Sequence, residues 1–416
     1  TSTVSFTIDA DARGYISATV TDRAGNSSET TDEGINTIVA DDNKPVVTVS
    51  YKTKDGTKVQ YKDASNETTE SFKTATRAYY DGEVTAKITI NEANFVEGIQ
   101  AEDGIIHNIG VKLTKTDDEG NVTVTEYLPA GAAGKYAADE TAEIIWTTTG
   151  DEHTFEIEYK DNADYVLEIE YTDLSENEAE ISADDAANGT TKTYTSKTVT
   201  VDKTAPVINV EYDNNEALNE NNYKADRTAT VTIEEHNFRA EDVKVTVEAT
   251  DVEGKTVDIS AKKYEDYAKT AENWTEKDNV WTLDATGMEF DIDARYVVTI
   301  EYTDLSLNEA EKYETEFVVD KTAPSGLKIE YSENLISKII NAVTFGFYKE
   351  KVTVTLTASD DTSGVDYFDW KYTRETDASD VNTEELSGKI SVAAGKNRTS
   401  TVSFTIDADA RGYISA

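Results

Sequence analysis

The segment Val352-Thr-Val-Thr-Leu-Thr-Ala-Ser359 alternates apolar and polar side chains along its whole length. In an extended strand, successive side chains point to opposite faces, so the valines and the leucine share one face and the threonines the other. The segments 229–233 and 243–247 alternate in the same way. One apolar face per strand is typical of antiparallel sheets, whereas buried parallel strands are continuous apolar runs. The sequence therefore predicts a mostly β chain built from packed antiparallel sheets.

Three of the four prolines mark equivalent junctions between groups of such strands. The sequence Val-Asp-Lys-Thr-Ala-Pro ends at Pro206 and again at Pro324, and a looser version, Asp-Asp-Asn-Lys-Pro, ends at Pro45. Proline cannot donate a ladder hydrogen bond, so it ends a strand and stiffens the linker. The junctions predict module A with an insertion (45–205), module B (206–323) and a truncated module C (324–416), preceded by the C-terminal part of a C-type module (1–44).

Internal repetition supports this division. The segments Ile169–Glu180 and Ile300–Glu311 differ at a single position, and each lies shortly before a junction. The first eighteen residues, Thr1–Ala18, recur letter for letter as Thr399–Ala416. Such identity predicts that the chain is a window cut from a tandem array. Arrays project and present surfaces more often than they catalyse reactions, so repetition favours a binding or spacer role.

Composition excludes several classes of partner. The 416 residues include 83 Asp and Glu against 39 Lys and Arg, which gives a formal net charge of -44. Such a chain repels nucleic acid and anionic membranes, so we expect neither as a partner and no membrane insertion. The 38% of hydrophobic residues, with 23 Tyr, predict packed cores instead of disorder. Cysteine is absent, so the sequence excludes disulfides and thiolate metal sites.

Two smaller patterns recur at equivalent strand ends. Tyr15, Tyr165 and Tyr296 each follow an aspartate at the start of a penultimate strand. This position is typical of a tyrosine corner, whose hydroxyl we expect to bond the backbone across the sandwich. The pairs Asn94-Phe95 and Asn237-Phe238 follow cognate strands, and we interpret each as a turn asparagine with a core phenylalanine.

The Val-Asp-Lys-Thr-Ala-Pro junctions, the turn 21–26 (TDRAGN) and the segment 358–366 (ASDDTSGVD) carry a family resemblance. Through them the chain resembles bacterial immunoglobulin-like repeats of large cell-surface proteins over nearly its whole length. The resemblance implies tandem immunoglobulin-like β-sandwiches, an extracellular place at the bacterial surface with cell-wall attachment in a longer parent, and a role as stalk or adhesin. Some similar gut bacterial repeats bind host immunoglobulin through its variable domain, as B-cell superantigens. Host protein, and immunoglobulin in particular, is therefore the implied partner.

Two stretches show helical spacing of apolar residues instead of alternation. Ser332–Phe347 is one, and Tyr264, Tyr267 and Trp274 belong to the other. Each helix would either close one end of its own sandwich or present a recognition face. Aromatic residues are enriched among binding hot spots, which predicts protein binding by Tyr264, Tyr267 and Trp274.

A competing interpretation is a glycan-binding region of a large surface glycosidase, and a third is a pure spacer. Glycan binding would use exposed tryptophans at positions 146, 274 or 281, although Trp146 and Trp281 lie in Trp-Thr strands typical of a core. Catalysis is not expected. The histidines stand apart, and the sequence lacks the spacing of a catalytic triad, zinc motif or phosphate loop.

Calcium is the one cofactor that the chemistry favours. The ion prefers several hard oxygen ligands, and acidic side chains gather at the predicted module ends. A junctional calcium ion would stiffen the array, whereas the alternative is a set of solvated acidic turns, since no D-x-D-x-D-G loop occurs. The candidate ligands are Asp202, Asp320, Asp360 and Asp361, with Asp41 and Asp42 at the first junction.

The division of module C between the two ends of the chain predicts self-association. Residues 1–44 would supply the strands that follow residue 416 in a whole C-type module. Because an exposed sheet edge invites pairing, we expect head-to-tail strand exchange between molecules, or else disordered ends.

Overall fold

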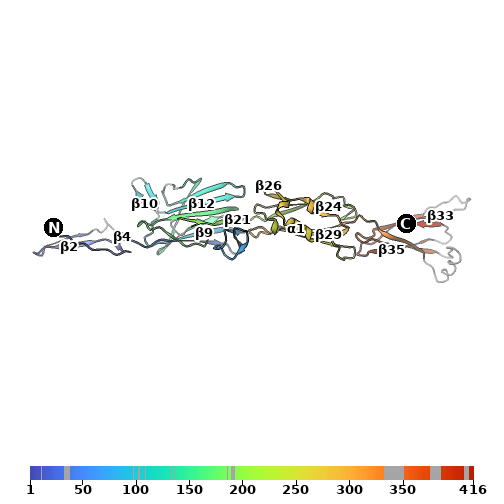
Figure 1. Ribbon diagram of the computed structural model, residues 1–416, viewed down its shortest axis with the longest axis horizontal. Coiled ribbons are helices and arrows are strands. Elements are labelled where there is room, and N and C mark those ends of the chain that lie inside the picture. Colours follow the sequence, from blue (N-terminus) through green and yellow to red (C-terminus); the bar gives the residue numbers. More distant parts are fainter. Residues whose placement is uncertain are drawn as a thin grey trace. The chain divides into compact units, whose positions relative to one another are not determined.

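Figure 1 shows the structure, a computed structural model, which consists of β-sheets. Most neighbouring strands are antiparallel, and four strand pairs among the described residues are parallel. The structure describes residues 1–416 other than 11, 32–37, 97, 102–103, 108, 133, 135, 185, 189–192, 332–350, 375–385 and 407–411. The prediction of a mostly β chain of tandem β-sandwiches is confirmed, and of the two predicted helical insertions the one that contains Tyr264 forms a short helix. None of the helices in the described part is long and apolar enough to cross a membrane.

The chain divides into two compact units, each of which is described by itself. Unit 1 holds residues 1–204 and 305–308, and unit 2 holds residues 205–304 and 309–416. Unit 1 contains one sandwich, that of module A, and two small hairpins before it. Unit 2 contains the sandwiches of modules B and C.

The sandwich of module A has a smaller and a larger sheet. The smaller sheet runs, in spatial order, β15 (Thr147–Thr149), β16 (Glu152–Tyr159), β9 (Val84–Asn91), β5 (Val46–Thr53) and β18 (Glu180–Ile181). The larger sheet runs β14 (Glu140–Glu143), β13 (Val122–Leu128), β12 (Ile109–Asp117), β17 (Ala163–Tyr171), β21 (Thr198–Val201), β8 (Arg77–Tyr80), β6 (Val59–Lys62) and β7 (Thr68–Thr69), with β20 (Thr193–Ser196) on β17 and β19 (Ala186–Asn188) on β20.

Alternation in these strands places the core between the two sheets. Ile88 and Ile90 of β9 are buried from one side, and Leu167 and Ile169 of β17 from the other. The strand register agrees with this alternation, because buried Leu167 lies directly opposite buried Leu113 on the antiparallel neighbour β12. Burying these aliphatic side chains stabilises the sandwich by roughly 1.5–3 kcal/mol each. The extra hairpin of module A is β10 (Gly98–Ala101) with β11 (Gly104–His107).

The residues before module A form two small hairpins instead of a sandwich. They are β1 (Ala12–Gly14) with β4 (Ile38–Ala40), and β2 (Ser17–Thr21) with β3 (Ser27–Thr31). All side chains of β2 are exposed. An isolated two-stranded hairpin is marginal in water because it has no core to cover.

Module B has two sheets and the one α-helix of the described residues. One sheet runs β22 (Val207–Tyr212), β24 (Arg227–Glu234), β27 (Val280–Leu283) and β26 (Trp274–Lys277), with β28 (Glu289–Phe290) on β24; the other runs β23 (Asn222–Tyr223), β30 (Tyr313–Val319), β29 (Ala294–Glu301) and β25 (Lys244–Thr250). Helix α1 (Lys262–Ala268) follows β25, and short 3-10 turns lie at 240–242, 271–273 and 285–287. The predicted helix over Ser332–Phe347 lies wholly outside the described residues.

Module C is a smaller sandwich of two three-stranded sheets. One runs β31 (Ser325–Tyr331), β32 (Val352–Ser359) and β35 (Thr399–Ile406), and the other β34 (Leu386–Ser391), β33 (Tyr367–Arg374) and β36 (Gly412–Ser415). Its fully buried core is small, with Val354 and Leu356 of β32 packed against Phe368 of β33. The threonines of β32 lie on the opposite face, as the alternation predicts.

The tyrosine corners form in the two larger sandwiches. The Tyr296 hydroxyl donates to the Ile292 carbonyl at 2.7 Å, and the Tyr165 hydroxyl donates to the Asp161 carbonyl at 3.1 Å. These carbonyls lie four residues earlier in the chain, so the expected bond across the sandwich is wrong and the corner is local. Burial raises the pKa of Tyr296 to about 12. Tyr15 is exposed and forms no corner.

Candidate functional site

The aromatic residues predicted to bind protein lie mostly inside module B. Tyr264 is 1% exposed and Trp274 6%, and both belong to the core. The Tyr264 hydroxyl donates to the Glu289 carbonyl at 2.7 Å, and Trp274 Nε1 donates to the Ala268 carbonyl at 2.7 Å. Helix α1 therefore closes the end of its own sandwich. The prediction of a recognition face formed by these aromatic side chains is wrong, because core packing uses them.

Tyr267, the third residue of that prediction, lies half-buried against the same core. Its hydroxyl lies 3.1 Å from Thr286 Oγ1. Its ring covers Gly287 so closely that a Cβ there would lie 2.1 Å from Tyr267 Cδ1. The absence of a side chain at Gly287 therefore lets the Tyr267 ring pack against its backbone. Tyr267, like Tyr264 and Trp274, helps to close the end of the sandwich.

The tryptophans considered for glycan binding also pack inward. Trp146 meets Phe95 edge-on with ring centroids 5.0 Å apart, and Trp281 stacks on Phe238 at 4.7 Å. Both phenylalanines pack against their module's core, which confirms the interpretation of the Asn-Phe pairs. Trp281 Nε1 donates to the Glu235 carbonyl at 3.0 Å. These rings therefore do not form an exposed platform for a sugar.

The first junction brings together three carboxylates that are distant in sequence. Asp41 follows β4, Glu92 follows β9 and Asp173 follows β17. One carboxylate oxygen from each lies within 4.8 Å of the other two. Two oxygens on opposite sides of a calcium ion, each at about 2.4 Å, lie about 4.8 Å apart. The spacing of this cluster, the Asp41 cluster, therefore suits a divalent cation with oxygen ligands.

Hydrogen bonds from the surrounding turns hold the three carboxylates in place. Asp173 Oδ1 accepts from the backbone N–H of Ser175 and of Asn177, both at 2.8 Å. The Asn94 backbone N–H donates to Glu92 Oε1 at 2.6 Å, and Asn94 Nδ2 donates to Asp41 Oδ2 at 2.8 Å. The asparagine of the Asn-Phe pair thus links two members of the cluster.

The electrostatics of the Asp41 cluster are unfavourable without a cation. Glu92 is 5% exposed and Asp173 4%. Burial raises the pKa of Glu92, and the neighbouring carboxylates of Asp41, Asp173 and Asp151 raise it further. Within the described ranges, no lysine or arginine forms an ion pair with Asp41, Glu92 or Asp173. Like charges gathered in a poorly solvated place favour either a proton or a bound cation.

The four predicted calcium ligands have different surroundings. Asp361 is exposed and forms an ion pair with Arg398 at 3.0 Å. Asp360 is buried, and its Oδ1 accepts the backbone N–H of Thr362 at 3.0 Å and of Gly364 at 2.8 Å. Burial raises the pKa of Asp320, and Asp360 adds to this shift. Asp202 is buried at the end of unit 1 and accepts the Thr204 N–H at 3.1 Å.

Sequence reasoning missed Glu92 and Asp173 as members of a cluster. Both stand in segments that it noted, INEANF and the Ile169–Glu180 repeat, but it interpreted these segments as turns. The available signal was an acid directly after an alternating strand in each module, at Glu92, Glu235 and Asp360.

In comparisons with known proteins, neither a family model nor a curated sequence matches this chain. The conclusions on function therefore depend on the chain's own residues and on their arrangement.

Proposed function

We propose that this chain is a non-catalytic array of β-sandwich modules, displayed at a bacterial cell surface as a stalk or adhesin that presents protein-binding faces. The observation that supports this most is that modules A and B repeat the same landmarks on separate closed cores. Each sandwich uses its own aromatic residues for packing. Binding then falls to the outward faces of the sheets and to the turns.

The outward faces are polar and charged, on a chain with a formal net charge of -44. Strand β16 exposes Glu152, Glu156 and Glu158 in alternation with buried Phe155 and Ile157, and each of the three glutamates forms an ion pair with a lysine. Such a face is a poor docking surface for nucleic acid or for an anionic membrane. It favours a protein partner with basic patches, because complementary charge speeds association and excludes other partners.

The proposed partner is host immunoglobulin, bound through its variable domain outside the antigen site. The sequence resemblance suggests this partner, and repetition makes it physically effective. Each further module that engages raises the effective local concentration for the next, so modest single-site affinity becomes strong avidity. Many copies would also cross-link receptors that carry the same variable domain.

The test uses the intact 416-residue chain. It is passed over immobilised Fab and Fc fragments of polyclonal immunoglobulin and, in parallel, over a glycan array. We expect binding to Fab across the polyclonal pool, whatever the antigen specificity, and no binding to Fc or to glycans. Binding to glycans alone would establish the glycosidase-accessory alternative. Binding to none of these surfaces would leave the spacer role and refute the adhesin proposal for this partner.

A further inference from the structure

A tight turn after β25 projects from module B toward module C within unit 2. Asp251 Oδ1 accepts the backbone N–H of Glu253 at 3.0 Å and of Lys255 at 2.9 Å. Gly254 takes a positive φ of 86°, which the turn requires and which glycine adopts without strain. This local hydrogen bonding holds Val252 at the tip of the turn.

Val252 is inserted into module C. It is 1% exposed although it stands at the tip of a turn. Its backbone N–H donates to the Asp361 carbonyl at 2.9 Å. A Cβ built on Gly364 would lie 3.4 Å from Val252 Cγ2, so the valine side chain faces the loop that Asp360 organises. The contact thus combines a buried apolar side chain with a satisfied backbone donor.

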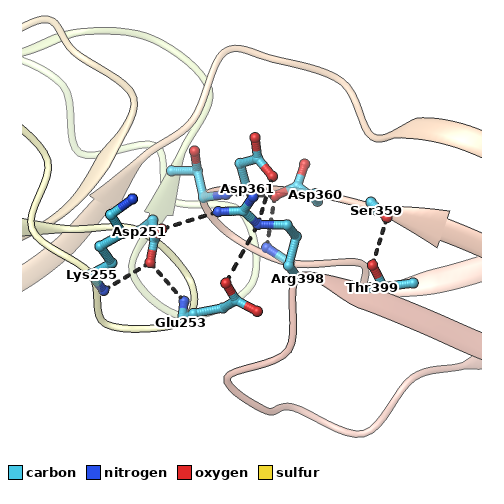
Figure 2. Close-up of polar contacts among 10 residues, drawn as sticks. Asp251, Glu253, Lys255, Ser359, Asp360, Asp361, Arg398 and Thr399 are labelled. Carbon is cyan, nitrogen blue, oxygen red and sulfur yellow. Dashed lines mark hydrogen bonds and ion pairs between the residues drawn. The ribbon is translucent and has the colours of Figure 1, made fainter.

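Arg398 closes the same contact from the side of module C, directly before β35. Its guanidinium meets three carboxylates, as Figure 2 shows: Nη2 lies 3.2 Å from Asp251 Oδ2, and Nε lies 3.0 Å from Asp361 Oδ1 and 3.6 Å from Glu253 Oε2. Two of these carboxylates belong to the turn of module B and one to module C. The Arg398 side chain is 41% exposed, so salt screens these ion pairs in part.

We infer that Val252, Asp251, Glu253, Asp361 and Arg398 form a clasp that fixes modules B and C in one orientation. Two modules joined by a short linker move relative to each other unless a specific contact prevents it. The clasp is such a contact. A second polar contact supports it, because Asn219 Nδ2 donates to Asp366 Oδ2 at 3.1 Å. The inference is independent of what the array binds.

Val252, at the tip of the turn, decides which turn fits against the loop of module C that contains Asp361 and Gly364, here called the socket. The cognate turn of module A, Asp117-Asp-Glu-Gly-Asn121, has the same geometry, with Asp117 Oδ1 accepting the backbone N–H of Glu119 at 3.1 Å and of Asn121 at 2.8 Å. At the position of Val252, however, it carries Asp118. A carboxylate in the socket would be desolvated beside Asp361, which is costly without a partner. The clasp therefore specifies the pairing of module B with module C.

Paired spin labels measure the orientation directly, and the absence of cysteine makes labelling clean. Labels are placed at Glu248→Cys in module B and Glu330→Cys in module C, both exposed. We expect a narrow distance distribution for the parent chain. Val252→Asp, which installs the module A residue, and Arg398→Gln should each broaden it about twofold or more, because module motion is then unrestrained. Arg398→Lys should give an intermediate width, since one ammonium cannot span three carboxylates.

The matched control is Lys255→Gln, in the same turn, where only the backbone N–H takes part in the clasp; its distribution should equal that of the parent. Amide exchange in β24 and β32 verifies that both sandwiches stay folded in each variant. A broad distribution in the parent chain would overturn the inference. So would unchanged widths in both Val252→Asp and Arg398→Gln with the two sandwiches intact. The two substitutions act on different parts of the clasp, so either one suffices if the other prevents folding.

Discussion

The same eighteen residues take two different structures in this molecule. In the copy Thr399–Ala416, strand β35 pairs in continuous register with β32, from Val352 opposite Ile406 to Ser359 opposite Thr399. Phe404 stacks on Trp370 with ring centroids 3.9 Å apart. In the copy Thr1–Ala18, residues 1–9 form no strand.

The exposure of the apolar residues follows this difference. Phe6 is 68% exposed, whereas its twin Phe404 is half-buried against the core of module C. The alternating pattern is identical in the two copies, so the pattern alone does not form a strand. A strand needs a neighbour to satisfy its backbone and a core to cover its apolar face. The eighteen residues specify an extended segment with one apolar side. A neighbouring strand and a core decide whether that side becomes buried.

The strongest test of this comparison truncates the two twin phenylalanines separately. We expect Phe404→Ala to destabilise module C by about 2–4 kcal/mol, because the substitution removes a stacked, half-buried ring. Phe6→Ala should change the stability by less than about 0.5 kcal/mol, as is usual for an exposed side chain. Urea denaturation with amide exchange in β32 measures the first effect. Equal effects of the two substitutions would contradict the structure of the N-terminal copy.

Alternation was sufficient to predict the strands, because period two fixes the buried face wherever a partner exists. Recurrence at fixed positions relative to strands placed the corners of Tyr165 and Tyr296 and the core phenylalanines Phe95 and Phe238, but it was wrong for Tyr15, which is exposed. The role of Tyr264 and Trp274 was not predictable in this way. Helical spacing shows that such residues share a face, but a core and a recognition surface favour the same aromatic residue types.

The sequence indicated Asp41 as a candidate ligand, but the Asp41 cluster as a whole could not be predicted, for a different reason. Its carboxylates come from three turns that only the closed sandwich brings together, and in a chain with 83 acids most neighbouring acids carry no information. The clasp could not be predicted either, because its residues also come from separate turns that only the folded structure brings together. Nothing in the sequence around Val252 distinguishes a buried tip from an ordinary exposed turn residue until the loop of Asp360 lies against it.

A second test asks whether a bound cation stabilises module A, the sandwich that follows the exposed N-terminal copy. If calcium occupies the Asp41 cluster, an ion at one hundred times its dissociation constant should stabilise module A by about 2.7 kcal/mol. Thermal unfolding with calcium or with a chelator measures this shift. Glu92→Gln should abolish it, and Glu83→Gln, an acid outside the cluster, should leave it unchanged. Identical transitions with calcium and with chelator would exclude the cation.

A third test concerns a corner that complete sandwiches form and the N-terminal copy does not. Tyr296→Phe should destabilise module B by about 1 kcal/mol, because it removes a buried hydroxyl and leaves the Ile292 carbonyl without this donor. Tyr15→Phe should have no measurable effect, since the Tyr15 side chain is exposed. Guanidinium denaturation of the two variants makes the comparison. A stability loss in Tyr15→Phe would mean that the Tyr15 hydroxyl is buried and bonded as that of Tyr296 is, which would contradict its exposure.

The smallest expected effect is a pH dependence of the stability of module A. It arises from the Asp41 cluster and not from either eighteen-residue copy. The pKa of Glu92 is raised above its usual 4.5 by burial and by neighbouring carboxylates. The folded state therefore holds this proton more tightly than the unfolded state does. The resulting stabilisation is complete below about pH 4.5 and is lost as the pH rises through the folded-state pKa.

In chelator, module A should thus lose stability between the unfolded-state pKa of Glu92 and neutrality. Glu92→Gln should remove that part of the pH dependence, because glutamine stays neutral at every pH in the range. Denaturation midpoints followed by amide exchange in β9, which lies directly before Glu92, measure the slope for this sandwich alone. Calcium should reverse the sign, since an ion displaces the proton and binds best when all three carboxylates are ionised. A slope that is the same in the parent and in Glu92→Gln would place the titrating group outside the cluster.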